Sequence, residues 1–240
     1  DAEGLFTIAN TTELRATEAL DFEAGESHTI TVRVDDGDNL YFIKNFTIEV
    51  TNINEAPLVI SLSSATVEEN SSEVAVGLLS CSDTDAGDEH TFELLTENTP
   101  FFLEGNALLL GADAGLDFET QDSYDLTFTA TDAGGLTTAE HTITISLSDV
   151  NEAPTAITVP ALSIVENSAE GTVLATLSAD DVDADETFTF SLSDSAGGRF
   201  MMDGADLVVA QGSLLDYEDT TEHTITIKVT DSGGLFTTQE

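Results

Sequence analysis

The chain has 240 residues, of which 47 are Asp or Glu and only 5 are Lys or Arg, so its formal net charge at pH 7 is −42. This charge excludes nucleic acid and anionic membrane surfaces as plausible partners and makes cations the favoured ones. No apolar run approaches the roughly 20 residues that a membrane-spanning helix needs. Cys81 is the single cysteine, which excludes a disulfide within the chain.

Taken in chain order, the segments that can be interpreted alternate between apolar and polar residues with a period of two. This alternation occurs at residues 29–34, 46–50, 124–130, 140–147 and 225–229. It predicts antiparallel strands that are buried on one face. Val, Ile, Thr and Phe dominate the strands, turn residues separate them and long amphipathic helices are missing. We therefore expect all-β sandwiches with about seven strands per unit.

Sequence motifs recur at an interval near 100 residues. Asn-Glu-Ala-Pro occurs at 54–57 and 151–154, and Leu-Asp followed by an aromatic residue and Glu occurs at 20–23, 116–119 and 215–218. Such an interval is the size of one β-sandwich domain rather than of one solenoid repeat. The chain is therefore interpreted as a tandem array.

The motifs define three expected domains. They are the C-terminal part of a repeat at 1–57, a complete repeat at 58–154 and a repeat lacking its last strand at 155–240, in an excerpt of a longer protein. Each of the first two ends in Glu-Ala-Pro. Because proline cannot donate to a strand ladder, we expect a short, rather stiff extended link there, with the sandwiches arranged end to end.

Acidic signatures sit at the same coordinates in successive repeats, at strand ends or in turns. In the middle repeat they are Glu69-Asn70, Asp83-Thr84-Asp85, Asp117-Phe118-Glu119, Asp132 and Asp149-Val150-Asn151-Glu152; the next repeat has Glu166-Asn167, Asp181-Val182-Asp183, Asp216-Tyr217-Glu218 and Asp231. In an extended chain, an Asp-x-Asp triplet directs both carboxylates to one face, about 6 to 7 Å apart. The set contains only oxygen ligands, which favours calcium and disfavours zinc and copper.

The acidic residues also allow other interpretations. Surface carboxylates also keep proteins soluble in salt water, which accounts for the scattered ones. Asp181 to Asp185 is not an EF-hand loop, because Glu186 stands at its sixth position and Leu192 at its twelfth. Paired carboxylates can hydrolyse glycosides, but an active site is seldom copied in each module. No phosphate loop or serine elbow was found, so the chain is not expected to be an enzyme.

These motifs, in this order, resemble those of the cadherin repeats: Glu-Asn, Asp-x-Asp, Leu-Asp-x-Glu, Asp-x-Gly and a terminal Asp-x-Asn-x-x-Pro. The resemblance implies tandem Ig-like (cadherin-like), seven-stranded antiparallel Greek-key β-sandwiches. The linker Asn-Glu-Ala-Pro looks most like that of the cadherin-like modules in large bacterial surface and secreted proteins. The chain has no tryptophan, so strand exchange anchored by that residue is not expected.

The resemblance also implies that calcium ions are held at each junction between repeats. Around Pro154 the implied ligands are Glu69, Asp117, Glu119, Asp149, Asn151, Glu152, Asp181, Asp183 and Asp231; around Pro57 they are Asp21, Glu23, Asn54, Glu55, Asp83, Asp85 and Asp132. Three departures from the pattern affect the expected number of ions. Glu55 and Glu152 replace the usual linker aspartate. Asn52 stands where the later linker has Asp149, and Asp185 replaces the glycine that Gly87 supplies in the middle repeat.

The expected function is therefore that of a calcium-stabilised adhesion or spacer segment at the cell surface or outside the cell. Without metal, the gathered carboxylates repel one another, and bound calcium is expected to stiffen the array. Expected partners are other surface proteins or glycans, including the same protein on a neighbouring cell, and the parent protein is expected to be exported and anchored or released. Two alternatives stay open: a polysaccharide-binding module, and part of a secreted enzyme whose catalytic domain lies elsewhere.

Overall fold

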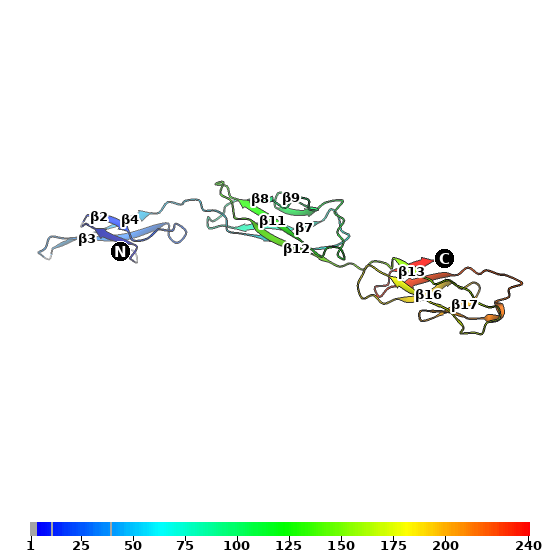
Figure 1. Cartoon of the computed structure of the whole chain (residues 1–240). Coiled ribbons are helices and arrows are strands. Elements are labelled where there is room, and N and C mark those ends of the chain that lie inside the picture. Colours follow the sequence, from blue (N-terminus) through cyan, green and yellow to red (C-terminus); the bar gives the residue numbers. More distant parts are fainter. Residues whose placement is uncertain (1–3, 11, 39) are drawn as a thin grey trace. The chain divides into compact units, whose positions relative to one another are not determined.

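The computed structural model describes residues 4–10, 12–38 and 40–240 (Figure 1). Within these ranges the chain consists of β-strands and loops, with one short 3-10 helix at Gly212–Leu214. None of the helices described is long and apolar enough to cross a membrane. The all-β fold class expected from the alternating pattern is confirmed.

Contacts divide the chain into two compact units. The first comprises the chain up to Val67 together with Ser71–Gly115 and Ser123–Ser146, and the second comprises Glu68–Asn70, Leu116–Asp122 and Leu147–Glu240. This division is not the division into three repeats expected from the motifs, and the boundaries at 57/58 and 154/155 stay predictions.

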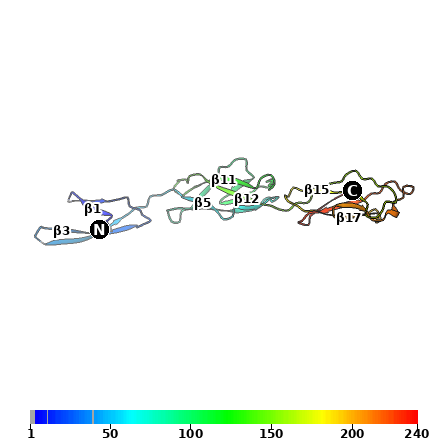
Figure 2. The same cartoon turned by 60° about the horizontal axis from the view of Figure 1, so that its bottom comes forward.

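The N-terminal part of the first unit contains two hairpins. Their strands are β1 (Phe6–Ala9), β2 (Glu13–Ala16), β3 (Ser27–Asp35) and β4 (Tyr41–Glu49). β1 pairs with β2, and β3 pairs with β4 from Ser27 opposite Glu49 to Asp35 opposite Tyr41. Ile30 is buried as expected, but Val34 is 62% exposed. Among the described residues β3 and β4 form a two-stranded sheet, to which no third strand is hydrogen-bonded, near the blue end of the chain (Figure 2).

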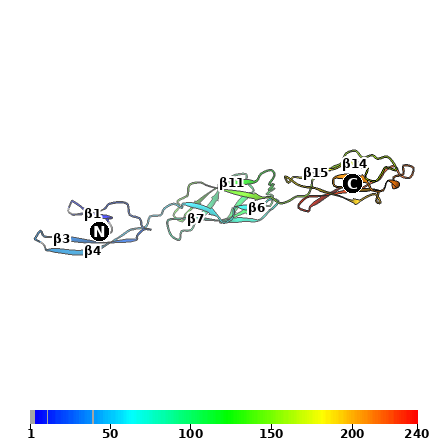
Figure 3. The same ribbon diagram turned by 90° about the horizontal axis from the view of Figure 1, so that it is seen from below.

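The middle of the chain forms two four-stranded sheets (Figure 3). Their strands are β5 (Val59–Leu62), β6 (Thr66–Glu68), β7 (Ala75–Ser82), β8 (Thr91–Leu94), β9 (Phe101–Glu104), β10 (Ala107–Leu110), β11 (Ser123–Thr131) and β12 (His141–Ser148). One sheet has the order β5-β7-β10-β9 and the other β6-β12-β11-β8; β6 runs parallel to β12, and the other pairs are antiparallel. Apolar residues at alternate positions, such as Leu126, Phe128 and Ile145, are completely buried.

The C-terminal part repeats this design in three smaller sheets. Its strands are β13 (Ala156–Thr158), β14 (Val173–Thr176), β15 (Ser178–Asp180), β16 (Thr189–Asp194), β17 (Phe200–Asp203), β18 (Asp206–Val209), β19 (Thr226–Thr230) and β20 (Phe236–Gln239). The sheets are β13-β15, β14-β18-β17 and β16-β19-β20. Ile227 and Val229 of β19 pack into one apolar cluster, and Phe200 and Leu207 into a second.

The acidic signatures lie where these strands end. Asp83 follows β7, Asp132 follows β11, Asp149 follows β12 and Asp231 follows β19. The extended segments before β5 and between β12 and β13 carry the two linkers, and neither is part of a sheet. We call residues 52–55 the first linker and residues 149–152 the second linker. The strands thus deliver carboxylates from distant parts of the sequence to the linkers.

Candidate metal centre

The second linker is held by hydrogen bonds to acidic loops of the second unit. The backbone N–H of Glu152 donates to Asp183 Oδ2 at 2.8 Å. Asn151 Nδ2 donates to Asp231 Oδ2 at 3.2 Å and to the carbonyl of Glu152 at 2.8 Å. These contacts place linker residues beside the Asp-x-Asp loop and the Asp-x-Gly turn, as the cadherin resemblance implied.

Glu69, directly after β6, is the most buried carboxylate in this region, with 3% of its surface exposed. Its Oε2 accepts from the backbone N–H of Phe118 at 2.8 Å, and its Oε1 accepts from the backbone N–H of Val150 at 2.8 Å. Charge-assisted bonds of this kind are among the stronger hydrogen bonds in proteins. Glu69 therefore ties the Leu-Asp-x-Glu loop to the start of the second linker.

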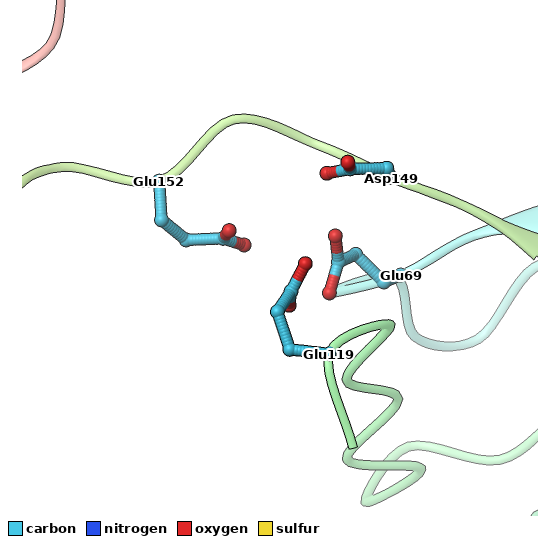
Figure 4. Close-up of side chains that lie close together, drawn as sticks. All are labelled: Glu69, Glu119, Asp149 and Glu152. Atoms are coloured by element: carbon cyan, nitrogen blue, oxygen red, sulfur yellow. The ribbon is translucent and has the colours of Figure 1, made fainter. Parts of the chain in front are cut away.

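Four carboxylates converge beside this linker (Figure 4). Glu69, Glu119, Asp149 and Glu152 each offer one oxygen, and these oxygens all lie within 4.8 Å of one another. Burial, followed by repulsion from Asp183 and Glu69, raises the pKa of Asp149. Burial and the charge of Glu69 likewise raise the pKa of Glu152. The four groups are therefore held together against their mutual repulsion.

Several carboxylate oxygens are buried and have no hydrogen-bond donor; one, on Asp88, belongs to the acidic loop at the first linker, and the others belong to the second linker and its Asp-x-Asp loop. Among the described residues these oxygens are Asp88 Oδ2, Glu152 Oε2, Asp181 Oδ2 and Asp183 Oδ1. A buried, unpaired carboxylate oxygen is costly unless a cation or a donor compensates it. Carboxylate and amide oxygens without nitrogen or sulfur ligands suit calcium, which accepts six to eight oxygens in loose geometry. The residues present therefore fit a calcium site.

The first linker repeats this arrangement within the first unit. The backbone N–H of Glu55 donates to Asp85 Oδ2 at 2.8 Å, and Asn54 Nδ2 donates to Asp132 Oδ2 at 2.8 Å. Oxygens of Glu23, Glu55 and Asp85 lie within 4.8 Å of one another. Burial and repulsion from Asp85 and Glu23 raise the pKa of Glu55.

A second acidic group beside the first linker consists of Asp83, Asp88 and Asp132, whose oxygens also lie within 4.8 Å of one another. Asp83 Oδ2 is 2.8 Å from His90 Nε2, and this hydrogen bond lowers the pKa of Asp83. The group thus contains two expected ligands and one residue, Asp88, that the motifs did not single out. Glu186 stands at the equivalent position in the next repeat, so identity between repeats could not reveal it.

Five of the aspartates expected as ligands lie outside the carboxylate clusters found among the described residues. Asp21 and Asp117 accept backbone hydrogen bonds within their own turns, from Glu23 at 2.9 Å and from Thr120 at 2.9 Å respectively. These two aspartates lie outside the clusters found among the described residues, as do Asp181, Asp183 and Asp231. Asp183 and Asp231 nevertheless contact the second linker through the hydrogen bonds given above, and Asp181 lies in the same loop as Asp183 with its Oδ2 buried and without a donor.

Sequence reasoning missed three further features. Glu166, Asp216 and Glu218 form a fourth cluster with oxygens within 4.8 Å of one another, although only their motif had been noted. A Cβ atom on Gly134 would overlap the Asn54 carboxamide, and one on Gly233 would overlap the Asn151 carboxamide. The repeated Asp-x-Gly motif was the available signal for both glycines.

The chain is similar to known proteins along most of its length. Residues 160–240 match the Cadherin domain family. Human Protocadherin beta-1 is 30% identical over 243 residues, which cover 93% of this chain and 30% of that protein. The chain thus spans less than a third of this relative.

Solved structures show the same fold. Protocadherin Gamma B2 extracellular cadherin domains 3-6 align with a TM-score of 0.67 and 22% identity, covering 99% of this chain and 61% of that one. The Protocadherin gammaB7 EC3-6 cis-dimer structure aligns with a TM-score of 0.64 and 26% identity, covering 98% and 62%. The first of these structures consists of extracellular cadherin domains, and an extracellular location of this chain belongs to the proposal below. Such domains are in general structural modules rather than enzymes.

Proposed function

Because residues 160–240 belong to the Cadherin domain family, we propose that the chain is a calcium-binding segment of an extracellular adhesion or spacer protein. Calcium bound at the two linkers would stiffen a series of β-sandwich repeats. In this proposal residues 58–154 are one complete repeat, and residues 1–57 and 155–240 are parts of its neighbours.

The observation that carries the proposal is the convergence of Glu69, Glu119, Asp149 and Glu152 on one space beside buried oxygens that have no donor. Without a cation, this arrangement stores electrostatic repulsion, which a more open linker would relieve. Bound calcium supplies the positive charge that turns this repulsion into attraction. An ion that binds the closed arrangement and not the open one shifts the population toward the closed one.

The residues that we propose as ligands fall into two sets. The second linker would use Glu69, Glu119, Asp149, Asn151, Glu152, Asp181, Asp183 and Asp231, with Asp117 from the same loop; the first linker would use Asp21, Glu23, Asn54, Glu55, Asp83, Asp85 and Asp132. Support for both sets comes from the same backbone contact, which joins Glu152 to Asp183 and Glu55 to Asp85 at 2.8 Å.

The proposed partners are other surface proteins or glycans, and they include a second copy of this protein on a neighbouring cell. One matched structure is described as a cis-dimer of Protocadherin gammaB7, which supports contacts between copies. The parent protein is proposed to be exported and then anchored at the cell surface or released. Its assignment to the bacterial type of module rests on the Asn-Glu-Ala-Pro linkers.

Calorimetric titration of the full chain with calcium tests the metal site. We expect saturable binding, and we expect the double variant Glu119→Gln/Glu152→Gln to bind at least about tenfold more weakly at the second linker, because it removes two charges from the cluster. The control is Glu97→Gln/Glu104→Gln, which changes two exposed acids outside the clusters. No heat of binding, or equal loss in the control, would refute the proposed function.

A further inference from the structure

The two linkers differ at one position that faces the same aspartate. In the first linker Asn52 Nδ2 donates to Asp85 Oδ1 at 2.7 Å. In the second linker Asp149 stands at the position of Asn52, and Asp183 stands at the position of Asp85. Asp183 Oδ1 is buried and has no donor. The side-chain amide of Asn52 thus donates to Asp85 Oδ1, whereas the corresponding oxygen of the second linker, Asp183 Oδ1, has no donor.

The rest of this contact is the same at both linkers. Asp85 Oδ2 accepts from the backbone N–H of Glu55 at 2.8 Å, and Asp183 Oδ2 accepts from that of Glu152 at 2.8 Å. The backbone therefore holds the two aspartates alike, and the difference arises from the side chain opposite them. In the first linker this side chain is a neutral donor, and in the second it is a carboxylate.

A second pair of residues repeats the difference independently. His90 Nε2 lies 2.8 Å from Asp83 Oδ2 and serves as its hydrogen-bond donor. At the equivalent positions of the next repeat stand Phe188, which has no donor, and Asp181, whose Oδ2 is buried and unpaired. Asp83 and Asp85 thus each accept a side-chain hydrogen bond on one oxygen, whereas Asp181 Oδ2 and Asp183 Oδ1 have no donor.

These donors change what a cation contributes at each linker. At the first linker a hydrogen bond already compensates Asp83 and Asp85, and calcium would have to displace or share those donors; Asp88 Oδ2 beside them is the one buried oxygen of the described residues there without a donor. At the second linker the buried oxygens of Asp181 and Asp183 gain a partner only when a cation arrives. The second linker also carries one more negative charge, and affinity for calcium rises with the number of charged ligands.

We propose that Asn52 is the residue that sets the calcium affinity of the first linker below that of the second, so that the second linker fills first as calcium rises. This inference rests on the proposed function. At intermediate calcium the second linker is stiff, while the first is held only by hydrogen bonds, those of Asn52 and Glu55 to Asp85 and that of Asn54 to Asp132. The second linker is then made rigid by bound calcium, and the first linker can still bend.

The test is calorimetric calcium titration of the full chain and of two reciprocal variants, Asn52→Asp and Asp149→Asn. We expect two affinity classes in the unchanged chain. Asn52→Asp should strengthen the weaker class at least about tenfold, and Asp149→Asn should weaken the tighter class by a similar factor. Asn52→Ala is the matched control, because it removes the hydrogen bond without adding a charge, and it should strengthen the weaker class by less than about threefold.

Melting in the presence of a chelator separates this role from a purely structural one. Without calcium, Asn52→Asp should melt at a lower temperature than the unchanged chain, because it places a carboxylate against Asp85. With saturating calcium the order should reverse. A single affinity class in the unchanged chain, or no change of calcium affinity in Asn52→Asp, would overturn the inference while leaving the proposed function intact. Absence of calcium binding in every variant would instead refute the proposed function.

Discussion

The side chain of Asn54 occupies the space next to Gly134 in which any Cβ atom would stand. The same carboxamide donates to Asp132 Oδ2 at 2.8 Å, so its position beside the glycine is fixed by the turn that it joins. Asn151 and Gly233 repeat the relationship at the second linker. The same close contact between a linker asparagine and a glycine thus occurs twice in the chain, as Asn54–Gly134 and as Asn151–Gly233.

Gly134→Ala should separate Asn54 from Asp132, because the added methyl group overlaps the carboxamide. We expect the calcium-loaded chain to melt about 4 °C or more below the unchanged chain, with weaker calcium binding at the first linker. Ala133→Ser, at the exposed neighbouring position, is the control and should leave both quantities unchanged. Scanning calorimetry with and without calcium measures the effect, and equal melting temperatures for Gly134→Ala and the control would contradict the steric account.

Asp183→Asn should have opposite effects with and without calcium. The amide keeps an oxygen for the backbone N–H of Glu152 and removes one charge from the crowded second linker. We therefore expect a higher melting temperature in chelator and a smaller rise on adding calcium. Thermal melts under both conditions give the comparison, with Asp203→Asn, an exposed change on β17, as the control. A variant that melts lower in both conditions would argue against repulsion as the dominant effect.

The stability of the middle sandwich should depend on Leu126, which is completely buried on β11. Leu126→Ala removes three carbon atoms from a packed site and should lower the free energy of unfolding by about 3 kcal/mol. Leu78→Ala changes a residue that is 55% exposed, and should cost less than about 1 kcal/mol. Urea denaturation measures both. Similar losses for the two variants would mean that the alternating pattern does not define the core.

Acidification should stabilise the metal-free chain over a limited range of pH. The pKa values of Glu119, Asp149 and Glu152 are raised, first by burial and then by neighbouring charges. The folded chain therefore binds more protons than the unfolded chain between the ordinary value of 4.5 for Glu and the raised pKa values. Because stability falls with pH wherever the folded state binds more protons, lowering the pH from 7 to about 5 should raise the melting temperature in chelator.

The pKa of Asp83 is shifted in the opposite direction, and this shift affects stability only at a pH below the range from 7 to 5. His90 lowers its pKa below the ordinary 3.8, so its contribution is lost only in stronger acid. Added calcium should reverse the trend between pH 7 and pH 5, because protons then compete with the metal for the carboxylates. Melting curves across this range, with Glu119→Gln/Glu152→Gln as the variant expected to flatten the profile, provide the check. A melting temperature that falls steadily on acidification in chelator would contradict it.

The alternating pattern predicted the core strands because a half-buried strand selects apolar residues at every second position, as Leu126 and Phe128 show. It failed at Val34, where the pattern is the same but 62% of the residue is exposed. The period-two alternation predicts which residues lie on the same face of a strand. Whether another layer covers that face depends on long-range pairing, which periodicity does not contain.

The candidate site was predictable to a similar extent. Repeated motifs identified Glu69, Glu119 and Glu152, because the same acid recurs at the same coordinate of another repeat, and Asp149 followed from the terminal Asp-x-Asn motif. Asp88 left none, since another acid replaces it in the next repeat. The donor role of Asn52 was equally hidden. It was noted as a lost charge, while its hydrogen bond to Asp85 depends on coordinates that only the folded linker supplies.

A crystal structure of the full chain grown with calcium, with anomalous differences used to locate the ions, tests the central claim most directly. We expect an ion about 2.3–2.6 Å from oxygens of Glu69, Glu119, Asp149 and Glu152, and bound oxygens on Asp181 and Asp183 where donors are now missing. Ions found only on scattered surface acids, with these carboxylates turned away from one another, would contradict it.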